Sequence, residues 1–131
     1  LKARAKLFEI DHLIEWRGFT EDTHYFYNSI DILVFFSEED CSPIITPLEA
    51  MANDIPVVAS CKFSKLNQFL ENEINCFIQD KNDIDLLVRQ ILLIISDYKF
   101  VNKIVASGKL LLQNSFSPKP YFSELVKRIK T

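Results

Sequence analysis

The sequence predicts an α/β fold in which helices flank a parallel sheet, with a helical tail at the C-terminal end. Two continuous apolar runs of strand length, DILVFFS at 31–37 and IPVVAS at 55–60, are typical of strands buried on both faces. Predicted strands alternate with helices through the first eighty residues, whereas the remaining residues favour helix. This order is expected of parallel strands joined by helices.

The other elements follow from composition and periodicity. Residues 12–18, HLIEWRG, predict a strand that ends at Gly18, because glycine tolerates the tight turn that follows. The run DIDLLVRQILLIISDY at 83–98 predicts a long amphipathic helix. Its predicted apolar face carries Leu87, Ile91, Ile94 and Ile95. The other predicted elements are, in chain order, helices at 1–9, 21–30 and 46–54, a short helix around 66–70, a strand at 75–79, and helices at 98–114 and 119–130.

The composition fits one compact globular domain, because 48% of the 131 residues are apolar and the net charge is only −3. That charge argues against a general nucleic-acid binder, which needs a basic excess. Cys41, Cys61 and Cys76 form no C-x-x-C pair, and neither histidine lies at metal-ligand spacing from them, so we expect reduced thiols. No apolar run approaches the ~18 residues of a membrane span, and no signal peptide is visible, which predicts a cytoplasmic protein.

The segment SEEDCSPIITPLEAMANDIPVVAS at 37–60 places several acids around a helix start that follows a buried strand. A structural interpretation is a capping box, in which Thr46 caps the helix, Pro47 takes the first helical position and Glu49 reaches back to the cap. A functional interpretation uses the same geometry, because ligands of parallel sheets bind beyond the carboxyl ends of the strands. A helix N-terminus offers N–H groups to phosphate, and a nearby acid suits the hydroxyls of a ribose or sugar. Spacing alone allows both.

With its flanking runs, this segment resembles the C-terminal, donor-binding domain of retaining glycosyltransferases with the GT-B fold (family 4, or group 1). The runs that carry the resemblance are EWRGF, SIDILVFFS, EEDCSPIITPLEAMA, NDIPVVAS and QFLENEINCFIQ. They occur in the family order over nearly the whole chain, and LEAMA followed by PVVAS is fairly specific. The resemblance implies a Rossmann-like GT-B half that binds a nucleotide-diphosphate sugar. The whole enzyme would transfer that sugar, with retention, to a glycan or lipid-linked acceptor.

The family's site residues are carried over where the motifs match. Glu49 matches the acid that holds the ribose hydroxyls, and the loop around Ser42–Ile45 matches the segment whose amides contact the donor sugar and diphosphate. The family's other acid falls at Cys41, so Asp40 or Glu39 is predicted to fill that catalytic role. The predicted donor-binding residues are Glu49, Ser42, Pro43, Ile44, Ile45, Thr46 and Gly18. The resemblance implies no cofactor and no metal, and Asp83-Ile84-Asp85 is explained by a helix start.

The chain also departs from the family pattern. The family's glycine pair falls at about Ser64-Lys65 in this chain, and the family's Asn-Gly falls at Asn75-Cys76, so these glycines are replaced here. The strand–loop–helix unit whose Arg and Lys neutralise the diphosphate is not found before His12, and the acceptor-binding domain is absent. The chain has no initiating Met. We therefore expect residues 1–131 to be one partial donor-binding domain that is inactive alone, with peripheral membrane association left open for the full enzyme.

Three alternatives remain open. A signalling receiver domain has similar buried strands, but it needs a phosphoacceptor Asp where this chain has Ser37 and an acidic pair that we do not find. A non-catalytic module that binds a nucleotide sugar would have the same fold and the same Glu49 role. A sugar-nucleotide epimerase with this fold is the weakest of the three. Donor base, sugar and acceptor cannot be deduced from these residues.

Overall fold

The computed structural model describes residues 1–36, 45–60, 69–79 and 82–116. Within them, three parallel strands form a sheet in the order β1-β2-β3, which confirms the predicted parallel sheet. The strands are β1 (Leu33–Phe36), β2 (Val57–Ser60) and β3 (Phe77–Gln79). Leu33 pairs with Val57 and Val58 with Phe77, so the central strand β2 is hydrogen-bonded on both sides.

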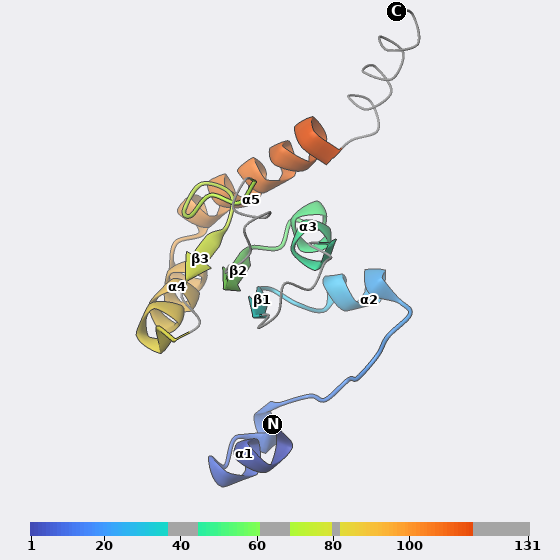
Figure 1. The fold of residues 1–131 in the computed structure, drawn as a ribbon, viewed down its shortest axis with the longest axis vertical. Helices are drawn as coiled ribbons and strands as arrows, with labels where there is room; N and C mark the ends of the chain where they lie inside the picture. Colours follow the sequence, from blue (N-terminus) through green and yellow to red (C-terminus); the bar gives the residue numbers. More distant parts are fainter. Residues whose placement is uncertain (37–44, 61–68, 80–81, 117–131) are drawn as a thin grey trace, which may run out of the picture.

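Helices cover both faces of this sheet. Helix α3 (Ile45–Ala52) lies on one face, α4 (Ile84–Ser96) lies on the other, and α5 (Tyr98–Leu111) contacts both of these helices (Figure 1). The core accordingly has two parts. On β2 the side chains alternate, so that Val57 packs toward the cluster with α3 and Val58 toward the cluster with α4 and α5.

Burial on both faces was predicted for both apolar strands and is correct for one of them. All four residues of β2 are buried, whereas Val34 and Phe36 of β1 are 43% and 40% exposed. The prediction is wrong for β1, an edge strand among the described residues, because α3 covers one of its faces whereas α4 lies over β3. An apolar run therefore identified the strand but not its position in the sheet.

The two long helices begin where the sequence predicts. At the start of α4 the Asp83 carboxylate accepts from the Leu86 N–H at 2.8 Å, and at the start of α5 Asp97 accepts from the Phe100 N–H at 3.0 Å. The predicted apolar face of α4 is only partly correct, since Ile94 is buried but Ile95 is 70% exposed. Helix α5 continues into a short π-helical turn, η3 (Leu112–Phe116). The predicted helix at 119–130 and most of the one at 66–70 lie outside the described residues.

Gly108 allows α5 to pack closely against α3 and the segment before β3. A Cβ built on it would lie 3.2 Å from the Asn75 carbonyl oxygen and 3.3 Å from Met51 Cγ. In that segment Cys76 is fully buried, and its thiol donates to the Glu71 carbonyl at 3.9 Å. This agrees with the reduced thiol expected for Cys76.

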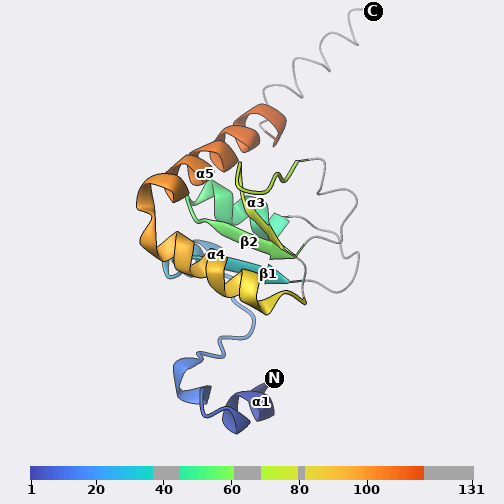
Figure 2. The same ribbon diagram turned by 90° about the vertical axis from the view of Figure 1, so that its left-hand side faces the viewer.

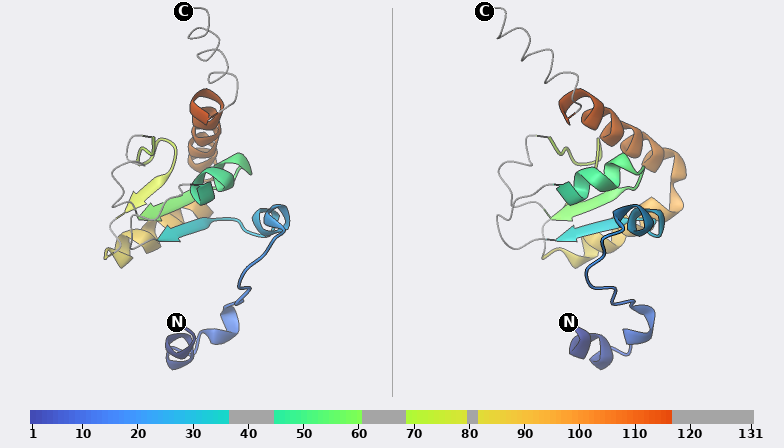
Figure 3. Two further views of the ribbon diagram at one scale, coloured as in Figure 1. Left: turned by 45° about the vertical axis from the view of Figure 1, so that its right-hand side comes forward. Right: turned by 90° about the vertical axis from the view of Figure 1, so that its right-hand side faces the viewer.

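The N-terminal part differs from the prediction at one element. Helix α1 (Lys2–Leu7) and helix α2 (Thr23–Asn28) are present as expected. The strand predicted at 12–18 is wrong, because Asp11–Leu13 forms a 3-10 turn, η1, and the rest is an unpaired connector to α2. Two further views show α1 and this connector standing away from the sheet (Figure 3). A strand requires a neighbouring strand, and none of the described residues lies beside this connector as one.

Candidate functional site

The three strands run in the same direction, so their carboxyl ends meet at one edge of the sheet. Helices α3 and α4 both begin at this edge (Figure 2). Polar groups at such an edge are well placed to meet a ligand. Five of the predicted site residues, Glu39, Asp40, Ser42, Pro43 and Ile44, lie outside the described residues and stay predictions.

The start of α3 does not form the predicted capping box. The helix already includes Ile45, so Thr46 lies inside it and Pro47 occupies the third helical position. Pro47 is tolerated there because the first N–H groups of a helix have no partner within the helix. Glu49 is not the returning member of a capping box either, because its carboxylate accepts from another helix.

The partner of Glu49 is Tyr27, on α2. The Tyr27 hydroxyl donates to Glu49 Oε2 at 2.9 Å and lies 3.4 Å from the Thr46 carbonyl oxygen. Tyr27 is 5% exposed, whereas Glu49 is half-buried. Burial, followed by the hydrogen bond to Glu49 and its negative charge, raises the pKa of Tyr27 from 10.0 to about 12. The hydroxyl therefore keeps its proton at neutral pH and can only act as donor toward the carboxylate.

Of the predicted site residues that the structure describes, three lie together on α3. Ile45 is exposed at the first position, Thr46 is half-buried beside it, and Glu49 lies one turn further along. Gly18 does not lie with them, because it belongs to the connector before α2 and no strand ends there. It adopts a left-handed φ of 68°, as expected for a turn glycine, and a Cβ built on it would meet no atom of the described residues within 4 Å.

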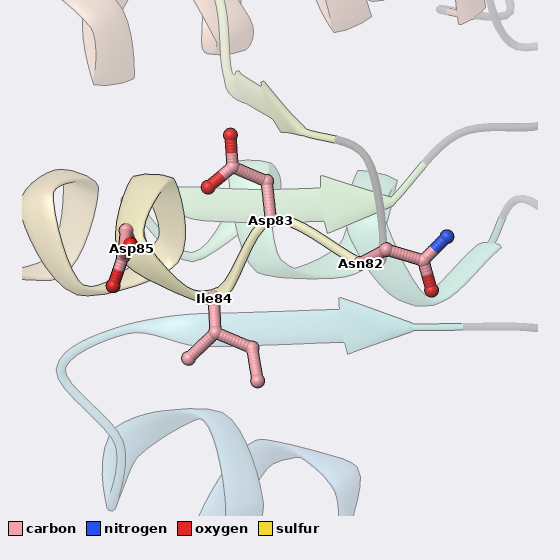
Figure 4. Close-up of a pocket in the computed structure, with 4 residues that line it drawn as sticks. All are labelled: Asn82, Asp83, Ile84 and Asp85. Atoms are coloured by element: carbon pink, nitrogen blue, oxygen red, sulfur yellow. The ribbon is translucent and has the colours of Figure 1, made fainter.

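A second acidic feature lies at the start of α4, where Asn82, Asp83, Ile84 and Asp85 line a hollow. Figure 4 shows the side chains of Asn82, Asp83 and Ile84 pointing in different directions, so they do not converge on a common centre. The Asp83 carboxylate caps its own helix. Among the described residues, no group of three or more His, Cys, Asp or Glu side chains is arranged to hold a metal ion.

Tyr27 was missed by the sequence reasoning. In the predicted helix at 21–30, the apolar residues Tyr25, Phe26 and Ile30 lie at roughly helical spacing, yet Tyr25 is 62% exposed whereas Tyr27 is buried. A buried tyrosine normally finds a hydrogen-bond partner for its hydroxyl. A tyrosine on a short helix that leads into a buried strand could therefore have pointed to such a partner, though not to Glu49 in particular.

A parallel sheet covered by helices, two of which begin at its carboxyl edge, defines an α/β domain of the kind that binds ligands at that edge. The sequence profile of the glycosyl transferases group 1 matches residues 1–110. The chain therefore belongs to this glycosyltransferase family, as its motifs had suggested.

Individual relatives agree with this assignment. An uncharacterized glycosyltransferase of Haemophilus influenzae is 25% identical over 114 residues, which cover 87% of this chain and 32% of that protein. The crystal structure of the C-terminal domain of LpcC, a glycosyl transferase group 1 family protein of Francisella tularensis, superposes with a TM-score of 0.68 at 18% identity. It is matched over 88% of this chain and 60% of its own.

Anabaena Alr3699/HepE, crystallised with UDP and glucose, superposes with a TM-score of 0.78 at 16% identity, and its UDP-glucose complex gives 0.76. These matches cover 98% of this chain and 35% of HepE. The likeness to solved structures shows the fold, a glycosyltransferase GT-B domain. The chain spans about a third of the length of the Haemophilus relative and of HepE. Among the described residues, no helix has both the length and the apolar character needed to cross a membrane.

Proposed function

We propose that this chain binds a nucleotide-diphosphate sugar at the carboxyl edge of its sheet, as the donor-binding part of a retaining glycosyltransferase. The observation that carries the proposal is Glu49, an acid on α3 that is held by Tyr27 rather than by its own helix. Family membership gives this acid its context, and the HepE crystal structures contain UDP with glucose, and UDP-glucose.

In this proposal Glu49 accepts hydrogen bonds from the ribose hydroxyls of the donor. The loop at Ser42–Ile45 and Thr46 would offer backbone groups to the donor sugar and the diphosphate, near the positive end of α3. Glu39 or Asp40 would contact the donor sugar. Fixed N–H groups and cations would stabilise the charge that builds on the leaving diphosphate, so that neither a metal nor a cofactor is required.

We further propose that residues 1–131 act as one partial domain. Acceptor selection would then depend on a segment that this chain does not contain, since it spans about a third of the full-length relatives. The acceptor would be a glycan or a lipid-linked glycan, and the site of action the cytoplasm or the inner face of the membrane. The chain by itself is expected to bind donor weakly and to transfer no sugar.

A second candidate is a non-catalytic module that binds the nucleotide sugar. Cys41 favours it, because a thiol stands where the family has the acid that touches the donor sugar. Both candidates use Glu49 in the same way. Transfer of sugar by this chain, after addition of an acceptor-binding partner, would support the transferase and exclude the module.

The test is an NMR titration of the chain with UDP, GDP and ADP. For one nucleotide, we expect shifts that cluster at residues 39–50 and are lost in Glu49→Gln. The exposed Glu21→Gln, which removes a carboxylate before α2, serves as the matched control and should titrate like the unmodified chain. Absence of shifts with all three nucleotides in the millimolar range would contradict the proposal.

A further inference from the structure

The contact between Tyr27 and Glu49 joins two helices that are 22 residues apart in sequence. Tyr27 is anchored by its own packing: it belongs to the core cluster with Leu33 and Ala50, and its ring meets Phe26 edge-on at 5.1 Å. A ring held in this way has a hydroxyl with a fixed position. The carboxylate that accepts from it is thereby fixed as well, although the Glu49 side chain by itself has several rotatable bonds.

We propose that Tyr27 is a positioning residue, whose hydroxyl holds Glu49 Oε2 so that Glu49 Oε1 faces the ribose diol of the donor. The inference rests on the proposed function, because it concerns the same acid and the same nucleotide. Glu49 Oε2 accepts from Tyr27, and none of the described residues donates a hydrogen bond to Oε1. A carboxylate has about four acceptor positions, so one donated hydrogen bond leaves enough capacity for two vicinal hydroxyls.

Holding the acid in advance has a physical benefit for binding. Ordering a flexible side chain upon binding costs conformational entropy, and a side chain that is already ordered avoids that cost. The Thr46 carbonyl oxygen, at 3.4 Å from the same hydroxyl, belongs to α3 too. Both acceptors therefore fix the hydroxyl relative to the helix that carries the acid.

A merely structural role would be that Glu49 satisfies the buried Tyr27 hydroxyl. The two roles differ in what a nucleotide without ribose hydroxyls would show. If Tyr27 acts through Glu49, its hydroxyl matters only for a nucleotide that has the diol. If Tyr27 only stabilises the fold around α3, its removal weakens every nucleotide equally.

The experiment compares the tightest binder among UDP, GDP and ADP with its 2′,3′-dideoxy analogue, by NMR titration of the whole chain. Tyr27→Phe removes only the hydroxyl, and Tyr25→Phe is the matched control, because it makes the same change at an exposed position of α2. We expect Tyr27→Phe to weaken the ribonucleotide about tenfold and to leave the dideoxy analogue unchanged. Tyr25→Phe should change neither affinity.

Each other outcome is decisive. Unchanged binding of the ribonucleotide to Tyr27→Phe, or equal losses for both nucleotides, would overturn the positioning role and leave the nucleotide site intact. Equal affinities of the unmodified chain for the two nucleotides would overturn the ribose role of Glu49. No binding of any nucleotide would overturn the proposed function itself.

A second measurement avoids the variant in case Tyr27→Phe does not fold. With tyrosine labelled at Cζ with carbon-13, the Tyr27 signal of the unmodified chain should shift upon addition of the ribonucleotide and stay in place with the dideoxy analogue. A signal that responds equally to both would contradict the inference.

Discussion

Two helix starts at the same edge of the sheet carry acids, and the acids are used differently. At the start of α4, Asp83 accepts from the Leu86 N–H of its own helix at 2.8 Å. On α3, Glu49 accepts instead from the Tyr27 hydroxyl of α2 at 2.9 Å. Asp83 is exposed and serves the local backbone, whereas Glu49 is half-buried and is oriented by a buried aromatic side chain.

The difference shows how a capping acid can be told from a candidate ligand-binding acid. In the sequence, both acids follow a predicted strand and lie near the start of a predicted helix. Their spacing therefore does not distinguish a capping acid from a ligand-binding acid. In the structure the capping acid is explained by the helix N–H that it accepts from. An acid held from another element has an orientation that helix formation does not require, and nucleotide titration separates service to the buried Tyr27 hydroxyl from the proposed binding of a ligand.

The largest expected effect is that of removing the buried side chain behind Glu49. Tyr27→Ala should lower the free energy of unfolding by about 3 kcal/mol, because it leaves a cavity between α2, α3 and β1. Tyr25→Ala, at an exposed position two residues earlier, should change it by less than about 0.5 kcal/mol. Urea unfolding measures both. Equal losses for the two variants would show that Tyr27 is not part of the core.

The next largest effect is a dependence of the free energy of unfolding on pH. Since the pKa of Tyr27 is raised from 10.0 to about 12 in the folded state, unfolded chains lose this proton first as the pH rises. The contribution to stability is therefore complete below about pH 10 and is lost between about pH 10 and 12, by up to about 2 kcal/mol.

Urea unfolding at several alkaline pH values checks this dependence. The decline should be smaller in Tyr27→Phe, which has no phenolic proton. In Glu49→Gln the Tyr27 titration, followed by tyrosinate absorbance, should move to lower pH because one negative charge and its hydrogen bond are lost. A Tyr27 titration unaffected by Glu49→Gln would mean that the two groups do not interact in solution.

A smaller effect is expected at the other helix start. Asp83→Ala should lower the free energy of unfolding by about 1 kcal/mol through loss of the cap of α4. Thermal unfolding measures it, and Asp83→Asn, which keeps a good capping side chain, should restore most of the loss. Neither variant should alter nucleotide binding. Failure of Asp83→Asn to restore stability would show that the charge, rather than the cap, is what matters there.

Local signals in the sequence were enough to predict β2, α4 and α5. A continuous apolar run indicates a strand, and an acid before a helix indicates the helix start, from only a few neighbouring residues. The strand expected at 12–18 failed, since strand pairing depends on a neighbour that composition does not reveal. The capping box failed because Thr46 and Glu49 have the right spacing but the helix begins earlier. The Tyr27–Glu49 contact was not predictable either, because a hydrogen bond across 22 residues depends on how α2 and α3 pack.

The most direct test of the central claim compares two charge-removing variants of matched shape, Glu49→Gln on α3 and Asp83→Asn at the start of α4. Both are titrated with the nucleotide that shifts residues 39–50 in the unmodified chain. Binding should be lost in Glu49→Gln and kept in Asp83→Asn. Unchanged binding in Glu49→Gln, or loss in Asp83→Asn alone, would contradict the assignment of the donor site to α3.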